Sequence, residues 1–277
     1  MARPHIEFIH EQVLPWSEGL NGGSRPGVSV RRLSADDETG GSSLVIRYPP
    51  GWQRMGPEHL TTDEEFIVLT GSLEINGRPY DQLAYGFFPA GYVRSSSSSR
   101  QGALVLTFFE SEPQAVPGEP ARPLSAGRTV EYLNALDGEW GGNFHPLFPP
   151  GAGRKWLRRD PVDGEETWIL GTMPLRSGRR PEKHPVIEEM FLLSGELIGP
   201  LGVMHAGAYF WRPPEIWHGP FGTKTGNLTF FRTKGGPLST VFTDAEQDFS
   251  WAPAHRPVLT PELAALGGKP YPGRPEF

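Results

Sequence analysis

The sequence predicts an all-β protein with few short helices, built from two similar halves. The first observation is an internal repeat: Glu64–Gly71 aligns with Glu188–Gly195, 124 residues further on, and the same offset aligns Pro89 with Pro213. The second is composition, because 35 Gly and 30 Pro among 277 residues are typical of short strands joined by turns. The length suits two domains of ordinary size, so the repeat predicts two similar cores.

Short apolar runs rich in β-branched and aromatic residues recur along both halves. Runs of this length between turn residues predict the strands of a β-sandwich or barrel. They lie at 43–48, 66–69 and 103–109 in the first half, and at 167–170, 190–193 and 228–231 in the second. One short helix is predicted near the end of the chain, with Thr260 as its N-cap, Pro261 as its first residue and Gly267 as its stop.

Composition also suggests the boundaries. Four prolines in the segment from Glu112 to Pro123 predict an extended linker. We therefore expect an N-terminal domain at 1–122, a C-terminal domain at 123–250 and a Pro-rich tail at 251–277. The serine run Ser95–Ser99 is predicted to be a polar loop from its composition.

Charge and cysteine content exclude several classes of function. The net charge of -6 provides no basic stripe, so nucleic acid is not expected as a partner. With no cysteine, any metal must be held by nitrogen and oxygen ligands. The first residues do not read as a secretory signal and no segment approaches the apolar length of a membrane span, so we expect a cytoplasmic protein without a membrane partner.

The second half contains a set of candidate metal ligands. Glu182 and His184 are two residues apart and can share one face of a strand, Glu188 opens the next apolar run, and His218 follows a Pro-rich turn. Two imidazoles and two carboxylates that converge inside a barrel suit a divalent first-row metal with positions left open for substrate.

At these residues the sequence resembles the cupin superfamily. The first cupin motif is G-x5-H-x-H-x3/4-E-x6-G, and Glu182-x-His184-x3-Glu188-x6-Gly195 follows it with Glu in place of the first His. The second motif, G-x5-P-x-G-x2-H, is matched by Pro213-x-Glu215-x2-His218, where Glu215 replaces the usual glycine. Because the repeat extends this likeness through both halves, the sequence resembles a bicupin.

The resemblance implies two tandem cupin barrels, each a double-stranded β-helix or jelly roll. It also implies that Glu182, His184, Glu188 and His218 are the metal ligands. The Glu-x-His order is similar to that of the manganese-dependent bicupin ureidoglycine aminohydrolase. An additional carboxylate favours Fe or Mn, with Zn or Ni as alternatives. Bicupins often pair, so a homodimer is compatible with the resemblance.

Two questions of register remain open at this stage. Glu189 should point away from Glu188, although a slip of one residue would exchange their roles. The pattern carried back to the first half falls on Pro57, His59, Glu64 and Arg94. An arginine cannot donate a lone pair to a metal, so we expect a structural first barrel with Arg94 paired to Glu64 or Glu58. The alternative is that Arg94 holds an anionic ligand.

Strand alternation and the turn before His218 suggest a substrate pocket lined by Met190, Leu192, Trp211 and Trp217. The leading hypothesis is a metal-dependent oxygenase acting on a small oxygenated compound, such as a dicarbonyl, an enol or a phenolic, with Glu182 or Glu188 as the catalytic base. One alternative is a hydrolase, isomerase or lyase that uses the metal without O2. Another is a non-catalytic sensor or small-ligand-binding cupin.

Overall fold

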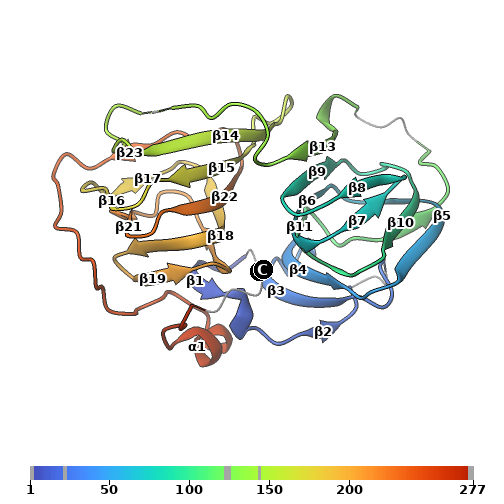
Figure 1. The fold of residues 1–277 in the computed structure, drawn as a ribbon, viewed down its shortest axis with the longest axis horizontal. Coiled ribbons are helices and arrows are strands. Elements are labelled where there is room, and N and C mark those ends of the chain that lie inside the picture. The colour runs from blue at the N-terminus through green and yellow to red at the C-terminus, as the bar shows by residue number, and fades with distance from the viewer. Residues whose placement is uncertain (1–2, 21–23, 122–125, 143–144, 274–277) are drawn as a thin grey trace. The chain divides into compact units, whose positions relative to one another are not determined.

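The structure is a computed structural model that describes residues 3–20, 24–121, 126–142 and 145–273 (Figure 1). It confirms the all-β fold class, since the regular structure in these ranges is almost entirely strand. The chain divides into two compact units: the first contains Leu14–Asp137, and the second contains His5–Val13 together with the residues from Gly138 onward. The boundary predicted near residue 122 falls at 122–125, outside the described residues.

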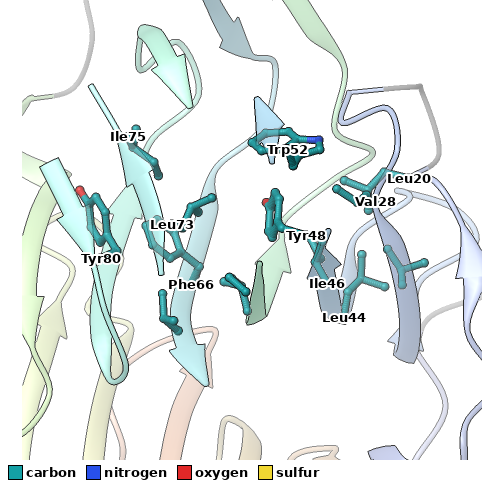
Figure 2. Close-up of a cluster of buried hydrophobic side chains, with 14 of the residues drawn as sticks. Leu20, Val28, Leu44, Ile46, Tyr48, Trp52, Phe66, Leu73, Ile75 and Tyr80 are labelled. Atoms are coloured by element: carbon teal, nitrogen blue, oxygen red, sulfur yellow. The ribbon is translucent and has the colours of Figure 1, made fainter. Parts of the chain in front are cut away.

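The first unit consists of two antiparallel sheets that share one core. The larger sheet has the spatial order β13 (Val130–Asn134), β9 (Ala84–Phe88), β6 (Glu64–Gly71), β11 (Ala103–Phe109), β4 (Ser42–Tyr48), β3 (Ser29–Ala35) and β2 (Ser17–Glu18). The smaller has the order β12 (Ala115–Pro117), β5 (Trp52–Leu60), β10 (Arg94–Ser99), β7 (Leu73–Ile75) and β8 (Arg78–Tyr80). Figure 2 shows side chains of both sheets meeting in this core, among them Ile46, Phe66, Ile75 and Tyr80.

The second unit is built around a larger antiparallel sheet. Its main path runs through β1 (Ile6–His10), β20 (Ala208–Arg212), β18 (Ile187–Gly199), β22 (Asn227–Lys234), β15 (Glu166–Thr172) and β14 (Ala152–Arg159). Three further strands extend it: β19 (Gly202–His205), β16 (Arg176–Ser177) and β21 (Gly222–Thr223). A separate ribbon pairs β17 (Glu182–Lys183) with β23 (Val241–Phe242). Thus a strand from the start of the chain completes a sheet made otherwise of residues beyond 150.

The six predicted strands are all present, and the repeat is visible in the turns that follow β6 and the first part of β18. Gly71 and Gly195 both adopt a φ of 77°, in the left-handed region. A Cβ added to Gly71 would collide with the carbonyl oxygen of Gly102, and one added to Gly195 with that of Gly226. Glycine is therefore required at equivalent places in both units, because a side chain would meet both strain and backbone.

Two predictions for the first unit need correction. Ser95–Ser99 is not a loop but most of β10, which forms ladders with β5 and β7. Composition misled the prediction because Ser97 and Ser99 are buried in the sheet, where neighbouring strands satisfy the backbone. The proline-rich linker is extended as expected, but Ala115–Pro117 pairs with the edge of β5.

The predicted C-terminal helix is confirmed as α1 (Pro261–Gly267). The Thr260 side chain accepts a hydrogen bond from the backbone N–H of Leu263, as an N-cap does. Two short 3-10 turns, η1 (Glu11–Val13) and η3 (Ala126–Arg128), complete the helical structure of the described ranges. None of the helices described has the length and apolar composition needed to cross a membrane.

Candidate metal centre

Three of the four predicted ligands lie together in the second unit. One donor atom from each of Glu182, His184 and His218 lies within 4.8 Å of the other two. The backbone places them: the N–H of Glu182 donates to the carbonyl of His218, and the N–H of His218 donates to the carbonyl of Glu182, both at 2.9 Å. This bridge brings β17 against the turn that follows β20.

Both imidazoles have a fixed orientation. The Nδ1 atom of His184 lies 2.9 Å from the carbonyl oxygen of Ser239, and that of His218 lies 2.9 Å from the carbonyl oxygen of Ile216. A carbonyl oxygen only accepts, so each Nδ1 donates, and in the neutral imidazole the Nε2 atom then keeps the lone pair that a metal would use. Both side chains are buried, and their ring centroids are 5.0 Å apart. Histidine ligands of metals are commonly oriented in this way, so the donors fit a divalent first-row metal.

The turn before His218 has the backbone conformation that the glycine of the cupin motif would suit, although residue 215 is Glu. Glu215 adopts a φ of 65°, and its N–H donates to the carbonyl of His184 at 2.8 Å. A left-handed conformation suits glycine, the usual residue of the motif, and costs other residues about 1–2 kcal/mol. Here the Glu215 carboxylate pairs with Lys183, which ties the strained turn to the strand that carries the ligands.

The fourth predicted ligand, Glu188, lies beside the cluster but already has a partner. Its carboxylate oxygens are 3.7 Å from Nε2 of His184 and 3.8 Å from Nε2 of His218. Arg212 donates through Nη1 to this carboxylate and through Nε, at 2.9 Å, and Nη2 to Glu7 of β1. The Glu188 carboxylate is therefore shared between a buried guanidinium and the cluster.

Burial and neighbouring charges shift the pKa values of this group. Burial raises the pKa of Glu182 to about 8, and the charge of Glu188 acts in the same direction. Burial lowers the pKa of His218 well below 6.5, and Arg212 adds to this effect. Burial alone would raise the pKa of Glu7, but Arg212 outweighs it and the pKa falls to about 2. Without a bound cation, Glu182 and His218 are therefore neutral at pH 7.

The cluster opens onto a cavity inside the second unit. Glu182, Glu188 and His218 all contribute to its wall. Three arginines, Arg176, Arg180 and Arg212, also line the cavity. The rest of the wall is mainly aromatic and apolar and includes Phe148, Leu170, Phe210, Phe221, Phe231 and Phe242. An apolar cavity with a few convergent polar groups is typical of a small-molecule site.

None of the four residues predicted to line a pocket lines this cavity, although Trp217 lines a second cavity that also contains Glu7 and His218. Met190 and Leu192 share the inward face of β18 with Glu188, as alternation predicts, but they are fully buried in the core and do not contribute to the cavity wall. Trp217 is 49% exposed and packs against the Nζ of Lys183, 5.2 Å from its ring centroid. The cavity therefore uses aromatic residues from other strands, which alternation within β18 could not identify.

Trp211 and Glu189 lie on the opposite face of the sheet. They are register partners in the pairing of β18 with β20. The carboxylate of Glu189 accepts a hydrogen bond from the Tyr209 hydroxyl at 2.6 Å and lies 3.3 Å from Nη1 of Arg232. No slip of one residue has occurred, so the residue beside the cluster is Glu188.

In the first unit, Arg94 occupies the position equivalent to that of the candidate ligand His218. Arg94 and Arg25 both donate to the buried carboxylate of Glu64, and Arg25 also donates to the Tyr48 hydroxyl at 2.6 Å. The expected pairing of Arg94 with Glu64 is confirmed. Burial raises the pKa of Glu64, but the two arginines outweigh it and the pKa falls. Within the described residues, the first unit contains no group comparable to the cluster of the second.

The register assigned to this half needs a correction. Arg94 pairs across the sheet with Glu58, just as His218 pairs with Glu182. Glu58 and Leu60 are therefore the equivalents of Glu182 and His184, in place of Pro57 and His59. The cupin motif allows three or four residues before its glutamate, and both units have three. The Nδ1 of His59 instead lies 3.0 Å from the carbonyl oxygen of Gly118.

Three charged residues of these sites were not predicted. Arg212 lies only six residues before His218, and the alternation of β20 could have placed it on the inward face. Glu7 and Arg25 come from segments outside the repeat, so no spacing rule connects them to the sites. A buried charge requires a partner, and the cupin motif provides none for Arg212. That missing partner was the signal in the sequence for a further buried carboxylate.

Comparisons with known proteins support the fold. No protein of curated function matches the sequence. A Nostoc punctiforme protein described as a "putative dioxygenase" has a TM-score of 0.78 over 90% of this chain and 92% of its own, at 19% identity. Oxalate decarboxylase from Bacillus subtilis gives 0.54 over 85% and 78%, at 13% identity. These cupin jelly-roll proteins show that the two units are tandem cupin barrels.

The comparison of sequence families covers both barrels. A family model described as "Domain of unknown function (DUF4437)" matches residues 6–240. This span contains Glu7, Arg212 and all four predicted ligands. The chain therefore belongs to the DUF4437 family.

Proposed function

We propose that this protein is a metal-dependent cupin enzyme that binds Fe or Mn in its second barrel. Glu182, His184 and His218 would hold the metal, with Glu188 as a fourth donor. The observation that carries the proposal is the pair of Nε2 lone pairs, each fixed by an Nδ1 hydrogen bond, beside a carboxylate in one buried cluster. Such nitrogen and oxygen donors leave coordination positions open for a substrate.

The side chains around the cluster would divide the remaining tasks. When bound, the metal supplies Lewis acidity and, in the case of Fe or Mn, redox chemistry with O2. The two histidines hold fixed orientations, and Arg212 restrains Glu188. Within the described ranges no side chain hydrogen-bonds the Glu182 carboxylate, and the Nε2 atom of His218 lies 3.9 Å from it. Glu182 is therefore the carboxylate better placed to exchange a proton with the substrate.

The reaction that we propose is oxygenation of a small oxygenated compound such as a dicarbonyl, an enol or a phenolic. The aromatic walls of the cavity would hold the carbon skeleton and exclude water from the cluster. The likeness to the Nostoc punctiforme protein supports this reaction class at the level of the fold.

The test combines metal analysis with oxygen consumption. Protein loaded anaerobically with Fe(II) or Mn(II) is mixed with a panel of diketones and phenols in an oxygen electrode. We expect one O2 consumed per product formed, and none by metal-free protein. Product formation without O2 uptake would refute the oxygenase reaction. Binding of a compound without formation of any product would favour the non-catalytic sensor.

A matched pair of variants tests the site itself. His218→Ala removes one lone pair, so it should abolish stoichiometric metal binding while the barrel stays folded. His59→Ala in the first barrel is the control, because its Nδ1 hydrogen bond to a carbonyl resembles that of a ligand histidine. Metal content is measured by mass spectrometry and folding by circular dichroism. Full metal content in His218→Ala would show that the assignment is wrong.

A second candidate is redox-neutral cleavage of a carboxylic acid. Arg176 on the cavity wall favours it, since a guanidinium can orient a carboxylate. Oxalate decarboxylase from Bacillus subtilis, a cupin of similar fold, contains Mn(II) centres. This candidate predicts CO2 release under anaerobic conditions, which an oxygenase cannot produce without O2.

A further inference from the structure

Arg176 is a cation on the cavity wall that no carboxylate among the described residues neutralises directly. Its Nε donates to the carbonyls of Pro149 and Pro150, at 3.2 and 3.0 Å, and its Nη2 donates to that of Pro149 at 2.8 Å. The guanidinium lies 4.2 Å from the ring centroid of Phe148. Within the described residues it forms no ion pair. The carbonyls fix the position of the guanidinium but leave its charge unbalanced.

This charge is costly in its surroundings. Burial lowers the pKa of Arg176 to about 10, and the charge of Glu182 only partly opposes that fall. Arg176 is only half-buried, but a partly desolvated cation in an apolar wall is still favoured by a nearby negative charge. The other guanidiniums of the cavity have carboxylates nearby: Arg180 lies 3.7 Å from Glu246, and Arg212 contacts Glu7 and Glu188. Arg176 is the exception.

A charge count of the loaded site leads to the same point. Glu7, Glu182 and Glu188 carry three negative charges, and Arg212 with a divalent cation would carry three positive charges. These groups together would then be neutral, and Arg176, like Arg154, whose charge also acts on Glu182, would add positive charge to the site. One carboxylate from a ligand would balance the charge of Arg176 through the short, charge-assisted hydrogen bonds that guanidinium groups form.

We propose that Arg176 is the subsite for a carboxylate carried by the substrate, which is then a small enolic or phenolic monocarboxylic acid. The acid would pair with Arg176 at one end and reach the cluster of Glu182, His184 and His218 at the other. The aromatic wall between them would contact its carbon skeleton. The substrate assignment rests on the proposed metal-dependent function, whereas anion binding by Arg176 can be measured independently.

The experiment compares charged and neutral ligands of the same shape. Calorimetric titrations of the Mn(II)-loaded protein, without O2, use acetate and benzoate together with acetamide and benzamide. We expect a carboxylate to bind the wild type with a Kd below about 10 mM and more tightly than its amide. Arg176→Gln should weaken carboxylate binding about 10- to 100-fold and leave amide binding unchanged.

Two further variants separate charge from loop structure. Arg179→Gln is the matched control, because Arg179 is largely exposed and lies 3.3 Å from Glu246; it should bind like the wild type. Arg176→Lys keeps the charge. Arg176→Gln could lose amide binding as well if the substitution disturbs the loop at Pro149. In that case, a recovered preference for carboxylates over amides in Arg176→Lys supports the subsite. Absence of that recovery overturns it.

The remaining outcomes distinguish the two proposals. Binding of benzoate by Arg176→Gln within about twofold of the wild type overturns the subsite. A wild type that binds neither carboxylate more tightly than its amide overturns it as well. Metal content is measured on the same samples. Protein that holds no metal at the cluster but binds carboxylates through Arg176 would refute the proposed enzyme while supporting the subsite.

Discussion

Replacing Glu7 by Gln removes the negative charge that faces the Arg212 guanidinium. Burial raises the pKa of Glu7, but Arg212 and the hydrogen bond with His5 outweigh it, and the pKa falls from 4.5 to about 2. At about 1.4 kcal/mol per pKa unit, this difference corresponds to about 3 kcal/mol in favour of the ionised carboxylate. Glutamine keeps an acceptor oxygen, so we expect a loss of about 2–3 kcal/mol in unfolding free energy at pH 7.

The pH dependence of this loss has a definite sign. A carboxylate whose pKa is lower in the folded state stabilises the protein fully above its unfolded pKa, and this stabilisation disappears as the pH falls through the folded pKa. For Glu7 the window therefore extends from 4.5 down to about 2. The difference in stability between wild type and Glu7→Gln should be constant above pH 5 and shrink under more acidic conditions.

Urea unfolding followed by tryptophan fluorescence measures this difference. Six of the eight tryptophans belong to the second unit, so the signal reports mainly on the barrel that contains Glu7. Glu215→Gln is the control: its side chain is 57% exposed and pairs with Lys183, so it should change stability by less than about 0.5 kcal/mol. A loss below about 1 kcal/mol in Glu7→Gln at pH 7, or one that does not vary with pH, would refute the reasoning.

Three other predictions concern the metal and the two barrels. Burial raises the pKa of Glu182 to about 8, and a metal must displace its proton. Metal affinity, measured by competition with a chelator, should therefore rise about tenfold per pH unit up to about pH 8 and then level off. A metal affinity that stays constant from pH 6 to about 9 contradicts this prediction. Arg94→Met leaves the buried Glu64 with one arginine. Urea unfolding should therefore show a first barrel destabilised by about 1–3 kcal/mol, while the metal content of the protein stays unchanged. Loss of metal in this variant would instead link the first barrel to the metal site. Gly195→Ala should cost at least about 2 kcal/mol, because its Cβ meets the carbonyl of Gly226 at positive φ; an unaltered melting temperature would count against this turn geometry.

The sequence was sufficient for the features that depend on local order or on the repeat. Alternating apolar runs and one constant offset predicted the strands of both barrels. The spacing of Glu182 and His184 predicted a shared face, and the cupin resemblance predicted that they meet His218, as one donor atom of each does within 4.8 Å. The capped helix at Pro261–Gly267 followed from three residues whose preferences are local.

Features that depend on distant partners could not be predicted in this way. The serines of β10 have low strand propensity, and only their ladders with two neighbouring strands make them a strand. Glu7 is 205 residues from Arg212, outside the reach of any motif. Phe210 and Met190 both belong to the apolar core of the second unit, and only packing makes Phe210 part of the cavity wall as well.

The position of β1 has a consequence for the newly made chain. Ile6–His10 leaves the ribosome long before its partner Ala208–Arg212 has been translated. At typical elongation rates the interval is roughly 10–40 s, during which this apolar segment has no strand to pair with and is open to chaperones. The guanidinium of Arg212 finds Glu7 only at the end of that interval. We therefore expect the second barrel to complete its fold late, when β1 pairs with β20.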